Sequence, residues 1–225
     1  MSAPSTETVI RISPGAPEIA VEHIDGGVTA RKLVTPESLA RCFLQSRFDS
    51  DTYPTGLLPE GCIAATLVSG EIWYFIRHSE LYADISYYGT EYLNFPLPRL
   101  VFGFRYLREE RKVARSRLCV IPDGRLRLDM PAFHYPFSNV SSTDGGICLG
   151  NNALPIYEDP SRLSTLPGHI LRMPNNNDHF SRAHNKPGLE YRDLLELLRD
   201  KPPAYYYTDI LVPNGKTLRD FINGG

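Results

Sequence analysis

Residues 137–152, FSNVSSTDGGICLGNN, contain the side chains of this sequence that are best suited to chemistry. A single cysteine, Cys148, follows an Asp-Gly-Gly turn and precedes Gly-Asn-Asn. A thiol held on an ordered loop is a candidate nucleophile for acyl transfer, because cysteine is intrinsically nucleophilic even when little of it is thiolate. The alternative is that Cys148 is a small apolar residue that fills space beside a turn.

Three further side chains are candidates to assist Cys148. Acyl transfer passes through an oxyanion, and one hydrogen-bond donor to that oxyanion is worth about 3–4 kcal/mol. Asn139 carries such a donor upstream of the turn, although an asparagine there also suits a turn-forming role. His184 lies in the polar stretch 179-HFSRAHN-185 and could supply a base or a hydrogen bond, or could be an ordinary surface histidine. Asp144 could orient an attacking amine, but Asp-Gly is first of all a turn sequence.

Composition limits the classes of function. The chain has 225 residues, a net charge of −2 and 42% hydrophobic residues, which is ordinary globular usage and argues against nucleic acid or a membrane as the main partner. The arginines of 105–127 fit a solvated strand face, or alternatively a docking site for an acidic partner or for nucleic acid. The four cysteines lie far apart, so we expect neither disulfides nor a metal site. The N-terminal residues do not resemble a signal peptide, and we expect a cytoplasmic protein.

The hydrophobic pattern predicts strands around a meander, with helices outside the sheet, which is an α+β fold. Residues 1–55 are predicted to form an N-terminal extension and residues 56–225 the main domain. The predicted helices are 36–46, capped at Thr35, 188–201, and a last turn at 217–222. The predicted strands are 7–12, 18–24, 28–34, 62–68, 71–78, 100–107, 112–121, 125–130 and 205–212. We also expect a hairpin turn at Asp25-Gly26, a turn at Asn214-Gly215, a Tyr-rich segment at 81–95 and long loops at 47–61 and 131–186.

The sequence around Cys148 resembles the active-site region of ubiquitin-conjugating enzymes. Those enzymes carry a His-Pro-Asn tripeptide, a glycine-containing turn, and then Ile-Cys-Leu, which here is Ile147-Cys148-Leu149. Asn139-Val140 matches the asparagine and the apolar residue after it, whereas His134 and Pro136 are not contiguous with Asn139. The chain is more similar to prokaryotic family D of these proteins, protein B of PRTRC systems, on the segments 98-PRLVF-102, 139-NVSSTDGGICLG-150 and 179-HFSRAHN-185.

This resemblance implies a ubiquitin-conjugating-enzyme-like antiparallel meander with flanking helices, and a transferase that needs no cofactor or metal. Cys148 would carry a ubiquitin-like modifier as a thioester, and Asn139 would stabilise the oxyanion. The implied partners are the modifier, a ThiF-like activating enzyme and a JAB-type peptidase. The alternative on the same fold is a non-catalytic module that docks a modifier or scaffolds a PRTRC-type complex. Because the chain ends in Gly224-Gly225, as ubiquitin-like modifiers do, a modifier role is a further alternative.

Overall fold

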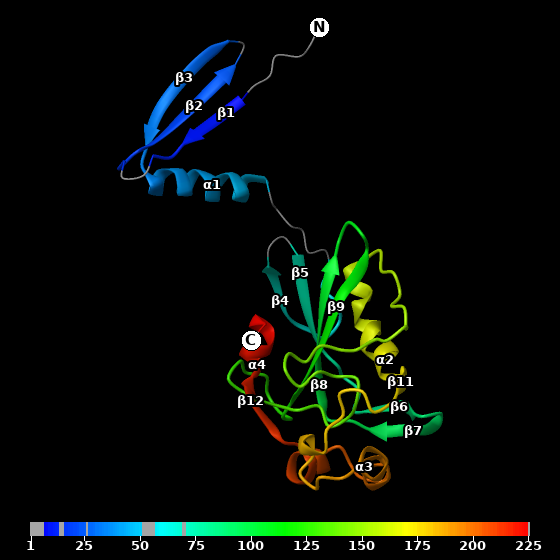
Figure 1. Cartoon of the computed structure of the whole chain (residues 1–225). Coiled ribbons are helices and arrows are strands. Elements are labelled where there is room, and N and C mark those ends of the chain that lie inside the picture. Colours follow the sequence, from blue (N-terminus) through cyan, green and yellow to red (C-terminus); the bar gives the residue numbers. More distant parts are fainter. Residues whose placement is uncertain (1–6, 14–15, 26, 51–56, 69–70, 225) are drawn as a thin grey trace. The chain divides into compact units, whose positions relative to one another are not determined.

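The computed structural model describes residues 7–13, 16–25, 27–50, 57–68 and 71–224 (Figure 1). The chain divides into two compact units, Met1–Pro54 and Thr55–Gly225. Each unit has its own sheet.

The first unit is a three-stranded antiparallel sheet followed by a helix. Its strands are β1 (Glu7–Arg11), β2 (Ile19–Asp25) and β3 (Val28–Val34), and its helix is α1 (Pro36–Ser50). The three predicted strands are confirmed, and the helix begins where predicted but continues past residue 46. Thr35 caps it, because the Thr35 hydroxyl accepts a hydrogen bond from the backbone N–H of Ser38 at 3.2 Å. Gly26 of the predicted hairpin turn lies outside the described residues.

A six-stranded sheet forms the centre of the second unit. In the order β12-β10-β9-β8-β5-β4, every neighbouring pair in it is antiparallel. The predicted pairs 62–68 with 71–78 and 100–107 with 112–121 are confirmed as the hairpins β4–β5 and β8–β9. The bounds of the six strands are β4 (Cys62–Val68), β5 (Glu71–Arg77), β8 (Arg99–Leu107), β9 (Lys112–Ile121), β10 (Pro131–Phe133) and β12 (Pro213–Thr217).

A smaller sheet is inserted between β5 and β8. The Tyr-rich segment forms the antiparallel hairpin β6 (Tyr82–Tyr87) and β7 (Thr90–Pro96), and β11 (Pro174–Asn175) pairs with β6 in parallel. β11 matters for the site below, because Asn175 contacts the loop that precedes Cys148.

The two faces of the six-stranded sheet differ in what covers them. Alternate side chains of β5, β8 and β9 point to opposite faces. The first face carries Tyr74, Phe102 and Leu118 in a large core, to which the helices α2 (Leu166–Leu171) and α3 (Tyr191–Leu198) contribute. The second face carries Trp73, Phe75 and Cys119 in a smaller core, to which α4 (Leu218–Asn223) contributes Leu218, Phe221 and Ile222.

Most of the short helices that follow the sheet strands contribute to the first core, whereas α4 contributes to the second. The predicted segment 188–201 is helical only over α3, but its buried stripe Tyr191, Leu194, Leu195 and Leu198 is confirmed. The last predicted turn is confirmed as α4. The helices and helical turns of the second unit are η1 (Pro160–Thr165), α2 (Leu166–Leu171), η2 (Arg182–His184), α3 (Tyr191–Leu198), η3 (Tyr206–Ile210) and α4 (Leu218–Asn223).

Two predicted strands are wrong. Residues 125–130 form turns. The side chain of Arg127 pairs with Asp129, and the backbone carbonyl of Arg127 accepts a hydrogen bond from the N–H of Met130. Residues 205–212 contain the π-helical turn η3, which closes through a hydrogen bond from Leu211 N–H to Tyr206 C=O at 2.9 Å. Both Tyr206 and Ile210 are fully buried, so the core selects helical spacing over the β propensity of this tyrosine-rich segment.

The described parts of the chain therefore form a mixed α+β protein whose strands are mainly antiparallel. Among its described helices, none combines the length and the apolar character needed to cross a membrane.

Candidate functional site

Cys148 lies on a loop with the geometry of a small hairpin. We call residues 139–150 the Cys loop. Its two arms pair in antiparallel fashion: Cys148 N–H donates to Asn139 C=O at 2.8 Å, and Ser141 N–H donates to Gly146 C=O at 2.9 Å. Val140 and Ile147 form the bridge between these bonds. The loop is thus fixed by its own backbone, although it contains no strand long enough to predict.

The Cys loop is also bonded to the edge of β9. Ile147 N–H donates to Ser116 C=O at 2.9 Å, and Leu118 N–H donates to Gly145 C=O at 2.8 Å. β10 pairs with β9 only at Phe133 and Val120, which leaves this part of the β9 edge to the loop. Cys148 therefore directly follows a segment that is hydrogen-bonded to β9 as a sheet strand would be.

Gly145 is required for this attachment. Its φ is +71°, and a Cβ built at this position would lie 2.6 Å from the carbonyl oxygen of Leu118. Asp144, the residue before it, accepts a hydrogen bond from Gly146 N–H at 3.0 Å and pairs with Arg115. The backbone hydrogen bond from Gly146 lowers the pKa of the Asp144 carboxyl, and Arg115 contributes further. Asp144 thus stabilises the turn, as its Asp-Gly sequence indicates.

Asn139 is placed next to Cys148 but its side-chain amide is engaged elsewhere. Its φ of 63° is left-handed, a conformation that asparagine tolerates better than most residues. The Asn139 Nδ2 atom donates to Pro174 C=O at 3.2 Å and lies 3.4 Å from Asn175 Oδ1. Its backbone N–H donates to Asp178 C=O at 2.7 Å. Asn139 therefore links the Cys loop to β11 and to the turn that follows it.

Cys148 is exposed and lines a shallow pocket together with Asn139. The walls behind it are mainly apolar and include Val140, Ile170 and Met173. In contrast, Cys119 on β9 is buried, and burial raises the pKa of its thiol to about 12. Burial also raises the pKa of the half-buried Cys62. Among the cysteines of residues 57–224, Cys148 is thus the accessible thiol.

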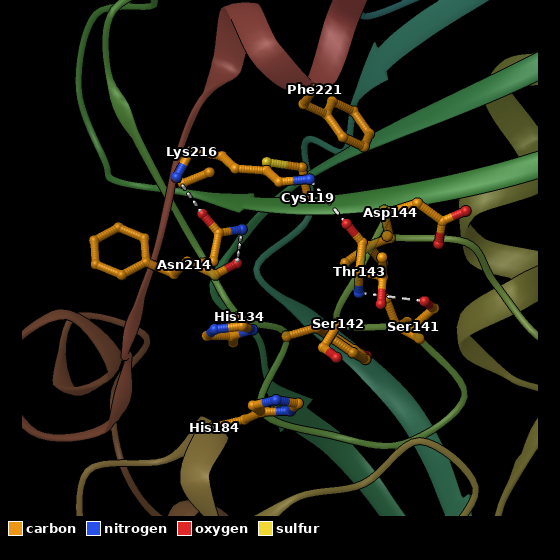
Figure 2. A pocket seen from close by; sticks show the side chains of 16 residues that line it. Cys119, His134, Ser141, Ser142, Thr143, Asp144, His184, Asn214, Lys216 and Phe221 are labelled. Atoms are coloured by element: carbon orange, nitrogen blue, oxygen red, sulfur yellow. Dashed lines mark hydrogen bonds between the residues drawn. The ribbon is translucent and has the colours of Figure 1, made fainter. Parts of the chain in front are cut away.

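His184 lies in a neighbouring pocket. The imidazole of His184 stacks on that of His134, with ring centroids 4.3 Å apart and planes at 5° (Figure 2). Ser141, Ser142, Thr143 and Lys216 also line this pocket, which shares the walls Leu118, Tyr135 and Val140 with the pocket of Cys148. Burial lowers the pKa of both histidines, and the pKa of His184 is lowered further by His134. Of the predicted site residues, Cys148 and Asn139 therefore share one pocket, whereas His184 lies in the other, beside His134.

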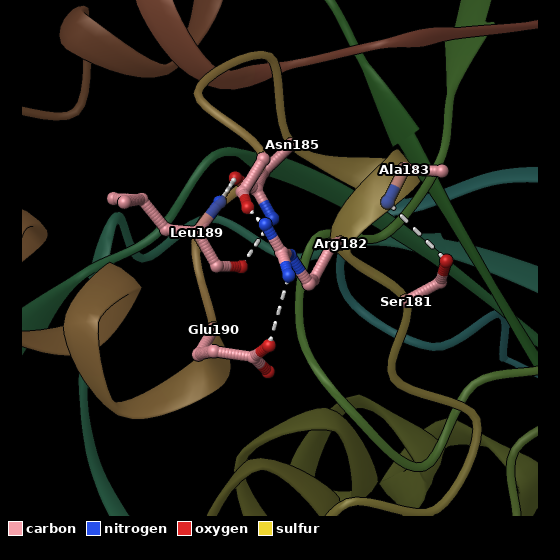
Figure 3. Close-up of polar contacts among 7 residues, drawn as sticks. Ser181, Arg182, Ala183, Asn185, Leu189 and Glu190 are labelled. Carbon is pink, nitrogen blue, oxygen red and sulfur yellow. Dashed lines mark hydrogen bonds and ion pairs between the residues drawn. The ribbon is translucent and has the colours of Figure 1, made fainter.

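The segment that carries His184 is fixed by local polar contacts (Figure 3). Asn185 accepts a hydrogen bond from Leu189 N–H at 2.8 Å and donates to Leu189 C=O at 3.2 Å. Arg182 Nε donates to Gly188 C=O at 2.8 Å, and the Ser181 hydroxyl caps η2 by accepting from Ala183 N–H. The position of His184 is thus set by its own loop and by the stack with His134.

Sequence reasoning missed two residues of this region, His134 as a partner of His184 and Asn175 as a partner of Asn139. Both pairs join residues far apart in the chain, so the local sequence has no signal for them. Lys216 of β12 was also missed; its Nζ donates to Thr143 C=O at 2.8 Å and ties the Cys loop to the sheet.

The comparisons add no family to this description: family models, curated proteins and solved structures give no match to the chain. Within the described residues, no group of three or more His, Cys, Asp and Glu side chains is arranged to hold a metal ion. Gly225, on which a modifier role would depend, lies outside the described residues.

Proposed function

We propose that this protein is a ubiquitin-conjugating-like acyl carrier that holds a ubiquitin-like modifier on Cys148. The observation that carries the proposal is an exposed thiol on a loop fixed by backbone hydrogen bonds on both sides. Such a loop presents the nucleophile at low entropic cost when a large acyl donor approaches. The meander β4-β5-β8-β9 ahead of the Cys loop supports a ubiquitin-conjugating-enzyme-like fold.

The chemistry consists of two acyl transfers. In the first, the Cys148 thiolate attacks the thioester carbonyl of the modifier on a ThiF-like activating enzyme; the new C–S bond forms, the old C–S bond breaks, and the activating enzyme leaves as its thiolate. In the second, an acceptor amine or hydroxyl attacks the Cys148 thioester, loses its proton to solvent, and expels the Cys148 thiolate. ATP is consumed by the activating enzyme, so Cys148 needs only an already activated acyl group.

The role of Asn139 in this proposal is to position the Cys loop. Its left-handed backbone turns its carbonyl towards the N–H of Cys148, and its amide bonds hold the loop against β11. An oxyanion role for Asn139 requires the side chain to release Pro174 C=O during the reaction. His184 remains a candidate base only for an acceptor that extends from the Cys148 pocket into the pocket of His134 and His184.

Reconstitution tests the proposal. The full chain is incubated with the cognate modifier, the activating enzyme and ATP, and a thiol-sensitive adduct is followed on a non-reducing gel. We expect the adduct in the wild type and in Cys42→Ala, which removes the other exposed thiol, and none in Cys148→Ala. An adduct that persists in Cys148→Ala overturns the proposal.

A second candidate is a non-catalytic module that docks a modifier or scaffolds a PRTRC-type complex. The engaged amide of Asn139 and the separation of His184 from Cys148 favour it. Alkylation rates measured against pH separate the two functions. A carrier should show Cys148 reacting faster than Cys42 at neutral pH, whereas equal rates with no adduct in the reconstitution support the module.

A further inference from the structure

A buried arginine on the second face of the sheet lacks an acidic partner. Arg117 is only 7% exposed, and no carboxylate within the described ranges forms an ion pair with it; its Nε also has no hydrogen-bond acceptor. Burial lowers the pKa of its guanidinium and Arg115 nearby lowers it further, whereas the carboxylate of Asp144 opposes this shift. A cation that has left water without forming an ion pair carries a large desolvation cost. Such a group needs a physical explanation.

The sheet itself places Arg117. Phe75, Gly103 and Arg117 are cross-strand neighbours on β5, β8 and β9. The Phe75 ring lies over Gly103, since a Cβ there would be 2.9 Å from that ring. The guanidinium carbon of Arg117 lies 4.2 Å from the ring centroid of Trp73 and 5.4 Å from that of Phe221. The cation–π contact offsets part of the cost of burial but accepts none of the N–H groups at the guanidinium edge.

Two more arginines surround the same tryptophan. Arg105 is directly opposite Trp73, and Arg115 is directly opposite Arg105. Arg105 donates to Glu71 at 2.8 Å through one terminal nitrogen, but its buried Nε has no acceptor. Arg115 pairs with Asp144. We call Arg105, Arg115, Arg117 and Trp73 the arginine face.

The charges on this face do not balance. The carboxylates of Glu71 and Asp144 are each committed to one arginine, at 2.8 and 2.6 Å. Among the described residues, Arg117 is therefore the arginine of this face that forms no ion pair, with Asp144 attracting it only from beyond ion-pair distance, and the buried Nε of Arg105 also lacks an acceptor.

We propose that the arginine face binds a carboxylate from an acidic segment of a partner protein, with Arg117 as the principal donor. A carboxylate pairs with a guanidinium edge-on and in its plane. An acidic segment presents several carboxylates and can contact Arg117 and the half-exposed Arg115 together, whereas a single phosphate ion contacts fewer of these arginines. This site is on another face from the pocket of Cys148, so it does not depend on the proposed acyl chemistry.

Trp73 is the only tryptophan of the chain and reports on the site directly. The full chain is titrated with a tetraglutamate peptide with blocked ends, and separately with inorganic phosphate at equal ionic strength, while tryptophan fluorescence is recorded. We expect a saturable change with the peptide and at least about ten-fold weaker binding of phosphate, because the linked carboxylates of one peptide can contact more than one arginine. Arg117→Met, which keeps an apolar stem over Trp73, should weaken peptide binding at least about ten-fold. Arg127→Met is the matched control, because Arg127 is an exposed arginine paired with Asp129, and should bind as the wild type.

Peptide affinity that is unchanged in Arg117→Met, or phosphate that binds as tightly as the peptide, overturns the proposal. If Arg117→Met does not fold, the Nε–H signals of the wild-type arginines are followed by nitrogen–proton NMR during the same titration. The signals of Arg117 and Arg105 should then move while that of Arg127 stays. Signals of Arg117 and Arg105 that do not move overturn the proposal without any variant.

Discussion

The Cys loop and the segment 181–190 are both irregular, yet they are held in different ways. The Cys loop is held by hydrogen bonds to the backbone of β9, in which Ile147 N–H donates to the strand edge and Gly145 C=O accepts from it. The segment 181–190 is held by the side chains of Arg182 and Asn185, which bind its own carbonyl groups. The first arrangement fixes the direction of an exposed thiol, and the second delivers His184 to a stack with another histidine. An exposed cysteine can therefore be positioned by a sheet without belonging to a regular strand.

The largest change in stability between these two regions is expected when a methyl group is added at Gly145. Gly145→Ala forces a left-handed φ on alanine and places its Cβ against Leu118 C=O, so we expect a loss of about 2–4 kcal/mol in the free energy of unfolding. Gly150→Ala is the matched control: Gly150 also has a positive φ, but no atom lies within 4 Å of its Cβ position. It should cost only about 1–2 kcal/mol. Chemical denaturation measures both, and equal losses would mean that the contact of the loop with β9 does not fix it.

A smaller effect is expected at Asn139, where two properties can be separated. Asn139→Gly keeps the left-handed backbone and removes the amide, whereas Asn139→Ala removes both. If Asn139 positions the loop, Asn139→Ala should lower the free energy of unfolding by about 1–3 kcal/mol and remove most of the adduct. Asn139→Gly should keep more of the stability and more of the adduct than Asn139→Ala. Equal loss of transfer in both variants, with stability retained in Asn139→Gly, would instead assign the amide to the oxyanion.

The main lines of the fold could be predicted from the sequence. The β4–β5 and β8–β9 hairpins and the buried stripe of α3 follow from hydrophobic periodicity and turn residues, which act locally. The π-helical turn at Tyr206–Ile210 could not be predicted, because it is decided by burial in a core built from residues far away in the sequence and not by local β propensity. Cys148 and Asn139 share a pocket because they flank one hairpin. His184 does not join them, because its stack with His134 depends on contacts between residues far apart in the chain.

The smallest effect is expected from pH, through the stacked histidines. Burial lowers the pKa of His134 and His184 below the ordinary value of 6.5. Their neutral forms therefore stabilise the fold fully above pH 6.5, and this contribution is lost as the pH falls below that value. His184→Phe keeps a ring for the stack but cannot take up a proton, so its stability should decrease less than that of the wild type between pH 7.5 and about 5. Unfolding free energies that fall in parallel for both proteins would show that the stack is not sensitive to protonation.

The most direct test of the account replaces sulfur by oxygen at the proposed acyl-carrying atom. The wild type and Cys148→Ser are charged with modifier, activating enzyme and ATP, and each adduct is treated with a thiol reductant before peptide mapping by mass spectrometry. We predict that the reductant cleaves the wild-type adduct, and that Cys148→Ser gives an ester that resists the reductant and maps to residue 148. An adduct that resists the reductant in the wild type, or that maps to another residue, would contradict the assignment of Cys148 as the acyl carrier.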